Sequence, residues 1–312
     1  MTVLFSTRRL VSLLTVPFLL AACAPQIQSM NSAEKPRGQT VYGITTTNQL
    51  ASFGTANPGT SVSTQPISGL IEGEILLGFD FEPGFNGTPT SMPPRPDRAG
   101  GTLFALSRSS RLYSLNLQTG AATVVGSQPF SPGLTGMDGG LDFNPQVNRL
   151  RVHGDDGQNL RLNQESGAVI DFDMVTPGIQ PDKTLMYKVG DVAAGQNPNI
   201  AGSAYTNSVR GTTSTVLYAI DSARDTLVTV APPNDGVLST VGALGVDTTQ
   251  HVGFDIAAQL QADGTVMNTA YATLTPVSEG ASSLYTVDLT TGRATLLGAL
   301  GRVVLRSIAV AP

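Results

Sequence analysis

The sequence predicts an all-β fold, a five-bladed β-propeller that closes by pairing its C-terminal strand with its N-terminal blade. Two observations carry this prediction. Short runs of Val, Thr, Leu, Tyr and Ile are bounded by Gly, Asn, Asp and Pro, which is the pattern of strands and turns. A unit of two strands, a turn and a third strand also recurs, at a spacing of roughly 50 residues that is typical of propellers and solenoids. Its clearest copies are residues 103–126, 217–242 and 283–298.

A different strand precedes the repeated unit. It begins with Gly in four places, and in three of them an Asp follows two residues later; the stretches are residues 78–83, 140–145, 202–207 and 253–256. The last residues, 306–312, resemble this strand, whereas residues 40–44 open the domain without one. If the C-terminal strand completes the N-terminal blade, backbone hydrogen bonds close the ring and no long edge stays open.

We therefore expect residues 40–312 to form a single domain of five blades with about four strands each. The main insertions are residues 84–100, which are rich in Pro, and residues 176–199. A β-sandwich is the alternative, and it explains the strands but not the circular offset between the two ends of the domain.

The first 22 residues have the features of a signal peptide. Arg8 and Arg9 precede an apolar run over residues 10–20 that is too short to span a bilayer. The run ends in Leu-Ala-Ala-Cys, which resembles a bacterial lipobox and implies cleavage before Cys23 and lipidation of its thiol. An ordinary cleavage site with an incidental Cys is the alternative. The paired arginines leave the Sec and twin-arginine export routes both open.

A lipid on Cys23 would anchor the protein to a membrane of the bacterial cell envelope. Residues 23–39 are polar and contain Pro and Gly, as expected of a flexible tether. Ala24 rather than Asp follows the Cys, which favours the outer membrane, with the domain facing the periplasm or the cell surface. Cys23 is the only cysteine, so the mature chain has no disulfide and no thiol nucleophile.

The charge of the chain argues against nucleic acid as a partner. The formal net charge is −5, and removal of residues 1–22 takes away two arginines and no acids, which leaves −7. Nucleic-acid binding needs clustered Lys and Arg to neutralise phosphates. Charged residues make up only 13% of the chain, while Gly and Pro together number 54.

Three aspartates, Asp80, Asp142 and Asp255, occupy the same position in three of the Gly-initiated strands. If these strands line the central channel, three carboxylates converge near its axis. They would then be candidate ligands for a hard cation such as Ca²⁺, or candidate acids and bases for glycoside hydrolysis. The alternative is structural: each carboxylate accepts backbone N–H bonds and holds its own blade.

One predicted hairpin, residues 149–163, is unusually polar. Strand alternation places Arg149, Arg151 and His153 on one face, and the neighbouring strand adds Asn159 and Arg161. One interpretation is a binding surface for an anionic or sugar-like ligand, with Arg as a forked donor. The other is a structural network that links blades through Asp142, Asp171 or Asp173, because buried arginines need carboxylates or carbonyls. The candidate ligand-binding residues are Arg149, Arg151, His153, Asn159, Arg161 and Asn207.

With these motifs the chain resembles a bacterial family known as domain of unknown function 4394. The resemblance covers most of residues 40–312 and is most specific from Leu141 to Asn163. It implies an exported, β-propeller-like protein and supplies no catalytic residues. The matching stretches are residues 140–145, 148–152, 157–163, 204–207, 233–236 and 241–247.

We expect a non-catalytic binding or scaffolding module of the cell envelope, with carbohydrate or an envelope protein as its partner. No complete catalytic motif supports an enzyme: there is no Gly-x-Ser-x-Gly elbow, no phosphate-binding loop and no Cys-based metal pattern. The alternatives are a glycosidase-like hydrolase that uses the three aspartates, and a protein–protein hub in an envelope complex. Ca²⁺ is the one cofactor that the sequence suggests.

Overall fold

The computed structural model describes Met1 and residues 33–83, 102–209 and 211–312, and its folded unit runs from Ala33 to Pro312. Apart from Met1, the predicted signal peptide lies outside the described residues, as do Cys23 and the insertion at residues 84–100. No helix in the described part of the chain is long and apolar enough to cross a membrane.

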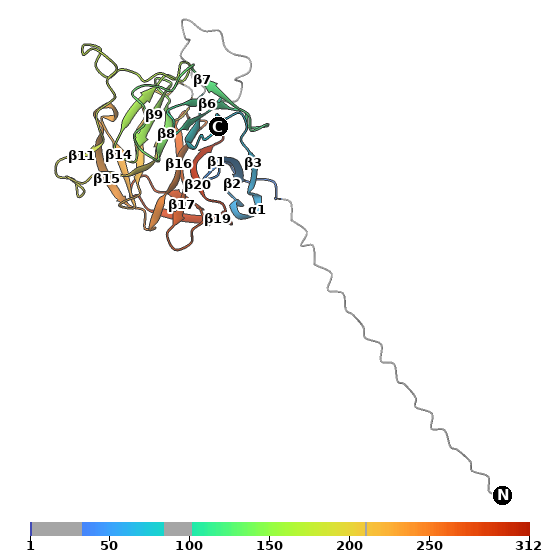
Figure 1. The fold of residues 1–312 in the computed structure, drawn as a ribbon. Helices are drawn as coiled ribbons and strands as arrows, with labels where there is room; N and C mark the ends of the chain where they lie inside the picture. The colour runs from blue at the N-terminus through green and yellow to red at the C-terminus, as the bar shows by residue number, and fades with distance from the viewer. Residues whose placement is uncertain (2–32, 84–101, 210) are drawn as a thin grey trace. The chain divides into compact units, whose positions relative to one another are not determined.

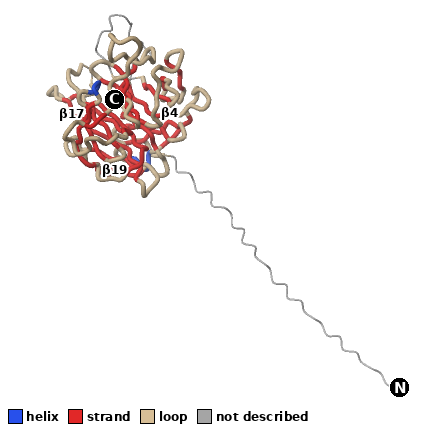
Figure 2. Tube along the Cα trace, turned by 60° about the vertical axis from the view of Figure 1, so that its left-hand side comes forward, coloured by secondary structure: helices blue, strands red, loops and turns tan. Residues whose placement is uncertain are grey.

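Five sheets form the blades of a five-bladed β-propeller, as the sequence predicts (Figure 1 and Figure 2). We number the blades from the one that contains the N-terminal strands and give each from its innermost strand outward. The first blade is β20 (Leu305–Val310), β1 (Thr40–Thr45), β2 (Gln49–Gly54) and β3 (Ser63–Pro66). The second is β4 (Leu76–Phe81), β5 (Leu103–Ser107), β6 (Leu112–Leu115) and β7 (Ala122–Val125).

The third blade is β8 (Gly139–Asn144), β9 (Arg149–Gly154) and β10 (Asn159–Leu162). The fourth is β12 (Ile200–Tyr205), β13 (Leu217–Asp221), β14 (Thr226–Val230), β15 (Val237–Ala243) and β11 (Met186–Tyr187). The fifth is β16 (Thr248–Leu260), β17 (Val266–Pro276), β18 (Ser283–Val287) and β19 (Ala294–Ala299). Two short helices, α1 (Pro58–Ser61) and η2 (Pro233–Asp235), lie in connections.

The ring closes between the two ends of the domain. β20 pairs antiparallel with β1, so that Val310 lies opposite Val41 and Ile308 opposite Gly43. The C-terminal strand is thus the innermost strand of the first blade, which confirms the predicted closure. Figure 1 shows β8, β16 and β20 toward the middle of the ribbon and β3, β11 and β19 at its rim.

The innermost strands approach one another too closely for a side chain at one position. Glycines 78, 140, 202 and 253 occupy equivalent places in β4, β8, β12 and β16. A Cβ atom on each would lie 2.5–3.0 Å from an atom of the next innermost strand. The initial Gly of the motif is therefore explained by inter-blade contact. β20 has Ser307 at this position, and its hydroxyl accepts a hydrogen bond from the Phe79 amide at 3.3 Å.

The third and fourth blades depart from the four-stranded pattern of the others. That blade has three strands, and the chain then runs through residues 163–199 to contribute β11 to the outer edge of the fourth blade, parallel to β15. Near the N-terminus, the amides of Glu34 and Arg37 bond to the Thr60 carbonyl and the Asn57 side chain. The described end of the expected tether is therefore attached to the first blade.

The core lies between neighbouring blades and differs in chemistry from one junction to the next. Phe104 of the second blade packs edge-on against Phe143 of the third, with ring centroids 5.6 Å apart. Apolar clusters also join the first blade to the second, the fourth to the fifth and the fifth to the first. The cluster around Leu185 and Leu238 joins the fourth blade only to its own insertion. Polar side chains fill the junction of the third and fourth blades.

Candidate functional site

The three aspartates of the innermost strands each bind the backbone of the next blade. The Phe143 amide donates to Oδ2 of Asp80 at 2.9 Å, and the Tyr205 amide donates to Oδ2 of Asp142 at 2.5 Å. The Val310 amide donates to Oδ2 of Asp255 at 2.6 Å. The same bond thus recurs at three junctions, so the aspartates hold neighbouring blades together.

Two of these aspartates, Asp80 and Asp255, also bind an amide of their own strand, because the preceding blade has no Asp at the equivalent position to bind it. β12 and β20 carry Ala204 and Ala309 in place of Asp, so the strands that follow them, β16 and β4, receive no carboxylate from the preceding blade. There the strand's own carboxylate serves instead. The Phe81 amide donates to Oδ1 of Asp80 at 2.7 Å.

Likewise, the Ile256 amide donates to Oδ1 of Asp255 at 2.6 Å. Five carboxylate oxygens therefore satisfy one backbone N–H in each of the five innermost strands. We call Asp80, Asp142 and Asp255 with these five amides the inner ring.

The three carboxyl groups of the inner ring lie close together, and their pKa values are raised. The carboxyl groups of Asp80 and Asp142 are hydrogen-bonded to each other, which requires a proton between them. Burial, followed by the charge of Asp80, raises the pKa of Asp142 well above its usual range. Burial raises the pKa of Asp80, and burial with the charge of Asp80 raises the pKa of Asp255 to about 7.

Backbone amides therefore already bind five of the six carboxylate oxygens of the inner ring. The sequence suggests Ca²⁺ binding or glycoside hydrolysis here, and both need free carboxylate oxygens facing a ligand. In the described residues, no group of three or more His, Cys, Asp or Glu side chains is placed to hold a metal ion. Asp80 and Asp142 are buried, whereas Asp255 is partly exposed.

The polar hairpin faces the fourth blade and forms a buried network. Arg151 is only 2% exposed, and its guanidinium forms an ion pair with Asp182 and donates to Asn159 Oδ1 at 2.8 Å and to Asn234 Oδ1 at 2.6 Å. Arg161 binds the same Asp182 carboxylate through two bonds of 2.8 Å. These contacts tie the hairpin to the insertion and to the fourth blade.

The partner of the arginines differs from the candidates that the sequence suggests. Asp182, within the insertion, binds Arg151 and Arg161, whereas the bonds of Asp142 go to the inner ring. Asp171 accepts backbone amides of its own loop through Oδ1. The structural network expected for this hairpin is therefore present, but with a different carboxylate.

Arg149 and Nδ1 of His153 also bond within the chain, whereas Nε2 of His153 is buried without a partner. His153 is fully buried, and its Nδ1 lies 2.8 Å from the Ser203 hydroxyl. Burial, together with the charge of Arg151, holds the pKa of His153 well below its usual range, so the ring is neutral. Arg149 donates to the carbonyl of Asn148 and to the side chain of Gln164.

Asn207 is the predicted ligand-binding residue that lies at an open site. It follows β12 and has a positive φ of 58°, a conformation that Asn tolerates better than most residues. Its amide donates to Asn268 Oδ1 at 2.8 Å, and the Asn268 amide group donates back to Asn207 Oδ1 at 2.7 Å. This exchange ties the β12–β13 connection to the β16–β17 hairpin.

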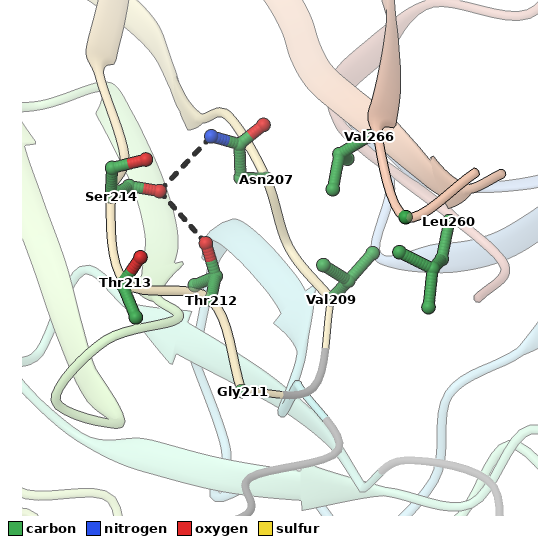
Figure 3. Close-up of a pocket in the computed structure, with 9 residues that line it drawn as sticks. Asn207, Val209, Gly211, Thr212, Thr213, Ser214, Leu260 and Val266 are labelled. Atoms are coloured by element: carbon green, nitrogen blue, oxygen red, sulfur yellow. Dashed lines mark hydrogen bonds between the residues drawn. The ribbon is translucent and has the colours of Figure 1, made fainter.

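A cleft of about 410 Å³ lies between these two segments, and we call it the Asn207 cleft. Figure 3 shows Asn207, Thr212, Thr213 and Ser214 on one side and Leu260 and Val266 on the other. The side chains of Asn207 and Thr212 both donate to the Ser214 carbonyl, at 3.0 and 2.8 Å, which braces the loop. Among the described residues, no charged side chain lines the cleft.

Sequence reasoning does not find several residues that the structure places at polar sites. Asp182 lies in an insertion without strand periodicity, so nothing marks it as the arginine partner. Asp138 and Arg306 form an ion pair although 168 positions separate them. Asp138 precedes a Gly-initiated strand, and Arg306 lies near the start of the last strand; that common placement is the only signal that points to their meeting.

Fold and site together define a β-propeller whose three repeated aspartates bond to the backbone of neighbouring blades. The chain belongs to the family described as "Domain of unknown function (DUF4394)", whose model matches residues 49–309. This confirms the resemblance seen in the sequence. A comparison with curated proteins found no match.

Solved structures of low similarity include several proteins. One is BBS1N in complex with ARL6DN, at 13% identity and a TM-score of 0.36, with 87% of this chain and 63% of that chain covered. PorZ of Porphyromonas gingivalis has 13% identity and a TM-score of 0.36, with 85% and 27% covered. A putative 6-phosphogluconolactonase from Bacteroides uniformis has 12% identity and a TM-score of 0.35, with 84% and 82% covered. The chain thus spans less than two thirds of the first two, and similarities this low carry no functional argument.

Proposed function

We propose that this protein is a non-catalytic binding or scaffolding propeller of the bacterial cell envelope, which holds its partner at the Asn207 cleft. The observation that carries the proposal is the contrast between the cleft and the charged candidates. The carboxylates of the inner ring and the Arg151–Asp182 network are bonded within the protein. The cleft is open and combines hydroxyl groups with partly exposed Val and Leu side chains.

The described residues of the cleft lining offer hydrogen-bonding groups and apolar groups side by side. Hydroxyl, amide and peptide groups line one side, and Val209, Leu260 and Val266 supply apolar contacts. A polypeptide segment or a glycan chain presents both kinds of group. The envelope location rests on the signal-like residues 1–22 and on the expected lipid at Cys23, which would also bring the propeller to a membrane.

Site-specific photo-crosslinking in the native cell tests the proposal. A photoreactive residue would replace Leu260, which is 61% exposed beside the cleft, or Leu296, which is 58% exposed on β19. We expect a discrete crosslinked partner from position 260 and none from position 296. Equal labelling from both positions, or none from either, would remove the support for the cleft as the binding site.

An activity assay tests the non-catalytic part. The full chain would be offered a panel of glycans and esters, with and without Ca²⁺, next to Asp142→Asn. We expect no turnover and no stabilisation by Ca²⁺, because the inner ring uses the carboxylates for backbone contacts. Turnover that Asp142→Asn abolishes in a folded protein would instead establish the hydrolase interpretation.

A further inference from the structure

A second polar cluster lies at the opposite end of the innermost strands from the Asn207 cleft. Asp138 directly precedes β8, His251 lies in the first part of β16 and Arg306 is the second residue of β20. Arg108 follows β5, in the turn next to the start of β4. The cleft instead follows the end of β12 and lies beside the tip of the β16–β17 hairpin. We call these four residues the channel mouth.

An ion pair crosses the channel mouth. Nη1 of Arg306 donates to Oδ1 of Asp138 at 2.5 Å, and both side chains are about nine-tenths buried, at 12% and 10% exposed. β20 and β8 are not neighbours in the ring, because β4 packs between them. The pair therefore joins the first blade to the third across the second blade. The inter-blade bonds of the inner ring, by contrast, join adjacent blades.

Arg108 and His251 lie near the ion pair of Arg306 and Asp138. Nη2 of Arg108 donates to the Met137 carbonyl at 2.8 Å, next to Asp138 in the chain. His251 interacts electrostatically with both Arg306 and Asp138. Asp155, in the β9–β10 turn, adds a negative charge near Asp138, and its Oδ1 accepts the Met137 amide. Four of the five blades thus contribute a side chain to the channel mouth.

Three buried nitrogen atoms of the channel mouth have no hydrogen-bond partner. They are Nε of Arg108, Nε of Arg306 and Nδ1 of His251. In the described part of the chain only seven buried side-chain nitrogen or oxygen atoms lack a partner, so nearly half belong to this one cluster. Buried polar groups in folded proteins are almost always bonded, and each exception calls for a water, an ion or a ligand.

The chemistry of these atoms restricts what complements them. The Nε–H of an arginine donates and cannot accept, and a protonated His251 would add another donor. The complement of two such donors is an acceptor, and a negatively charged one binds them most strongly. The ion pair with Asp138 occupies Nη1 of Arg306 and leaves its Nε free for this role.

We propose that the channel mouth binds an oxyanion, namely the carboxylate or phosphate group of a small ligand, through Arg108, Arg306 and His251. Asp138, next to β8 of the third blade, orients Arg306 of the first blade through their ion pair. This site is separate from the Asn207 cleft, and neither proposal depends on the other. It also differs from the inner ring, which contains the aspartates that the sequence brings forward.

The two histidines of the chain make the test direct. The full chain, in detergent and with ¹³C-labelled histidine, would be titrated by NMR in inorganic phosphate, in acetate and in chloride at equal ionic strength. Burial and the charge of Arg306 lower the pKa of His251, and an oxyanion bound beside it would raise that pKa. We expect a rise of about one unit in phosphate or acetate for His251, and no change for His153, which is the internal control.

Two variants locate the effect. Arg306→Gln should abolish the response of His251 to the anion, and Arg108→Gln should weaken it. Arg293→Gln, which removes an exposed arginine in the turn between β18 and β19, should leave it intact. An unchanged His153 signal shows that each variant is folded. If neither anion shifts His251 beyond chloride, or if the shift survives Arg306→Gln in a folded protein, water alone fills the site and the proposal is wrong.

A response to only one anion would identify the ligand class. Phosphate without acetate assigns the site to a phosphate group, and acetate without phosphate assigns it to a carboxylate. Both outcomes support the proposal.

Discussion

The interior of the propeller and its two open ends use polar residues in opposite ways. In the interior, Asp80, Asp142 and Asp255 bind backbone amides and Asp182 binds two arginines, so these carboxylates have partners within the chain. At the ends, the Asn207 cleft is open, and the channel mouth leaves three buried nitrogen atoms unpartnered. The charged groups that stand out in the sequence are therefore bonded within the chain. The polar groups at the two ends keep hydrogen-bonding capacity that a ligand could use.

We infer from this contrast that the hydrogen-bonding groups left free by the fold are better candidates for a binding site than the charged groups that stand out in the sequence. A repeated Asp indicates catalysis only if its oxygens are free. Here repetition has a structural cause, because one buried amide of each innermost strand needs an acceptor. A carboxylate of the preceding blade supplies it in β8, β12 and β20, and the strand's own carboxylate supplies it in β4 and β16. The predictions below follow this comparison, with large stability effects expected inside and small ones at the ends.

The largest effect should come from the Arg151–Asp182 network. Asp182→Ala leaves Arg151 buried without a carboxylate and removes both bonds of Arg161. Breaking a buried pair in this way costs about 3–5 kcal/mol of the free energy of unfolding. Chemical denaturation measures the loss.

Asp235→Ala is the matched control for that variant. It breaks an ion pair with Lys183 in which both side chains are well exposed, and such pairs contribute about 1 kcal/mol or less. Equal losses in the two variants would contradict the structural role of Asp182.

The next effect should distinguish the members of the inner ring. Asp80→Ala leaves the amides of Phe81 and Phe143 without an acceptor, whereas Asp142→Ala leaves only that of Tyr205. Each unsatisfied buried amide costs about 1–3 kcal/mol. We expect Asp80→Ala to lose about 2–4 kcal/mol and Asp142→Ala roughly half as much, measured by denaturation at the same pH. A larger loss of stability in Asp142→Ala than in Asp80→Ala would contradict the stabilising role of these amide–carboxylate bonds.

The inner ring should also make stability depend on pH. Asp255 has a folded-state pKa of about 7, above the value near 3.9 of an unfolded chain, so the folded protein keeps a proton that the unfolded chain releases. Its contribution is complete below the unfolded pKa and is lost as the pH rises through about 7. We expect the free energy of unfolding to fall by about 2–3 kcal/mol from pH 5 to pH 8.

Asp255→Asn is the control for this dependence. It removes the titrating group, so the slope of stability against pH between these values should become shallower. An equally steep slope in the variant would assign the dependence to other groups.

The smallest effect should be at the Asn207 cleft. Leu260→Ser changes a side chain that is exposed beside the cleft, so stability should move by no more than about 0.5 kcal/mol. The same variant should reduce capture of the partner by crosslinking from Val266, on the same hairpin. Undiminished capture from a folded Leu260→Ser protein would move the binding site away from the cleft.

Much of this fold is predictable because the signals are local and repeated. The Gly and Asp of the innermost strands recur at fixed positions, and the end strands complement each other, so five blades and their closure follow from the sequence. The outer strands are less regular, because the fourth strand of the third blade is absent and β11 joins the next sheet instead. Nothing periodic in residues 163–199 encodes that exchange.

The site residues are less predictable, for the same physical reason. The partner of Arg151 lies in a non-periodic insertion, and the ion pair of the channel mouth joins residues 168 positions apart. Such contacts depend on how the ring closes rather than on any local pattern. Asn207, which the sequence predicts to bind a ligand, lies at the open cleft in the structure. The crosslinking experiment tests whether the cleft binds a partner.

Amide hydrogen exchange of Asp80→Ala tests most directly whether the repeated aspartates hold the ring through backbone bonds. The five amides to compare are those of Phe81, Phe143, Tyr205, Ile256 and Val310. Global destabilisation lowers the protection of all five, and we predict that Phe81 and Phe143 fall further because they alone lose their acceptor. Equal loss at all five amides would contradict the inner ring and return the three aspartates to the list of candidate functional groups.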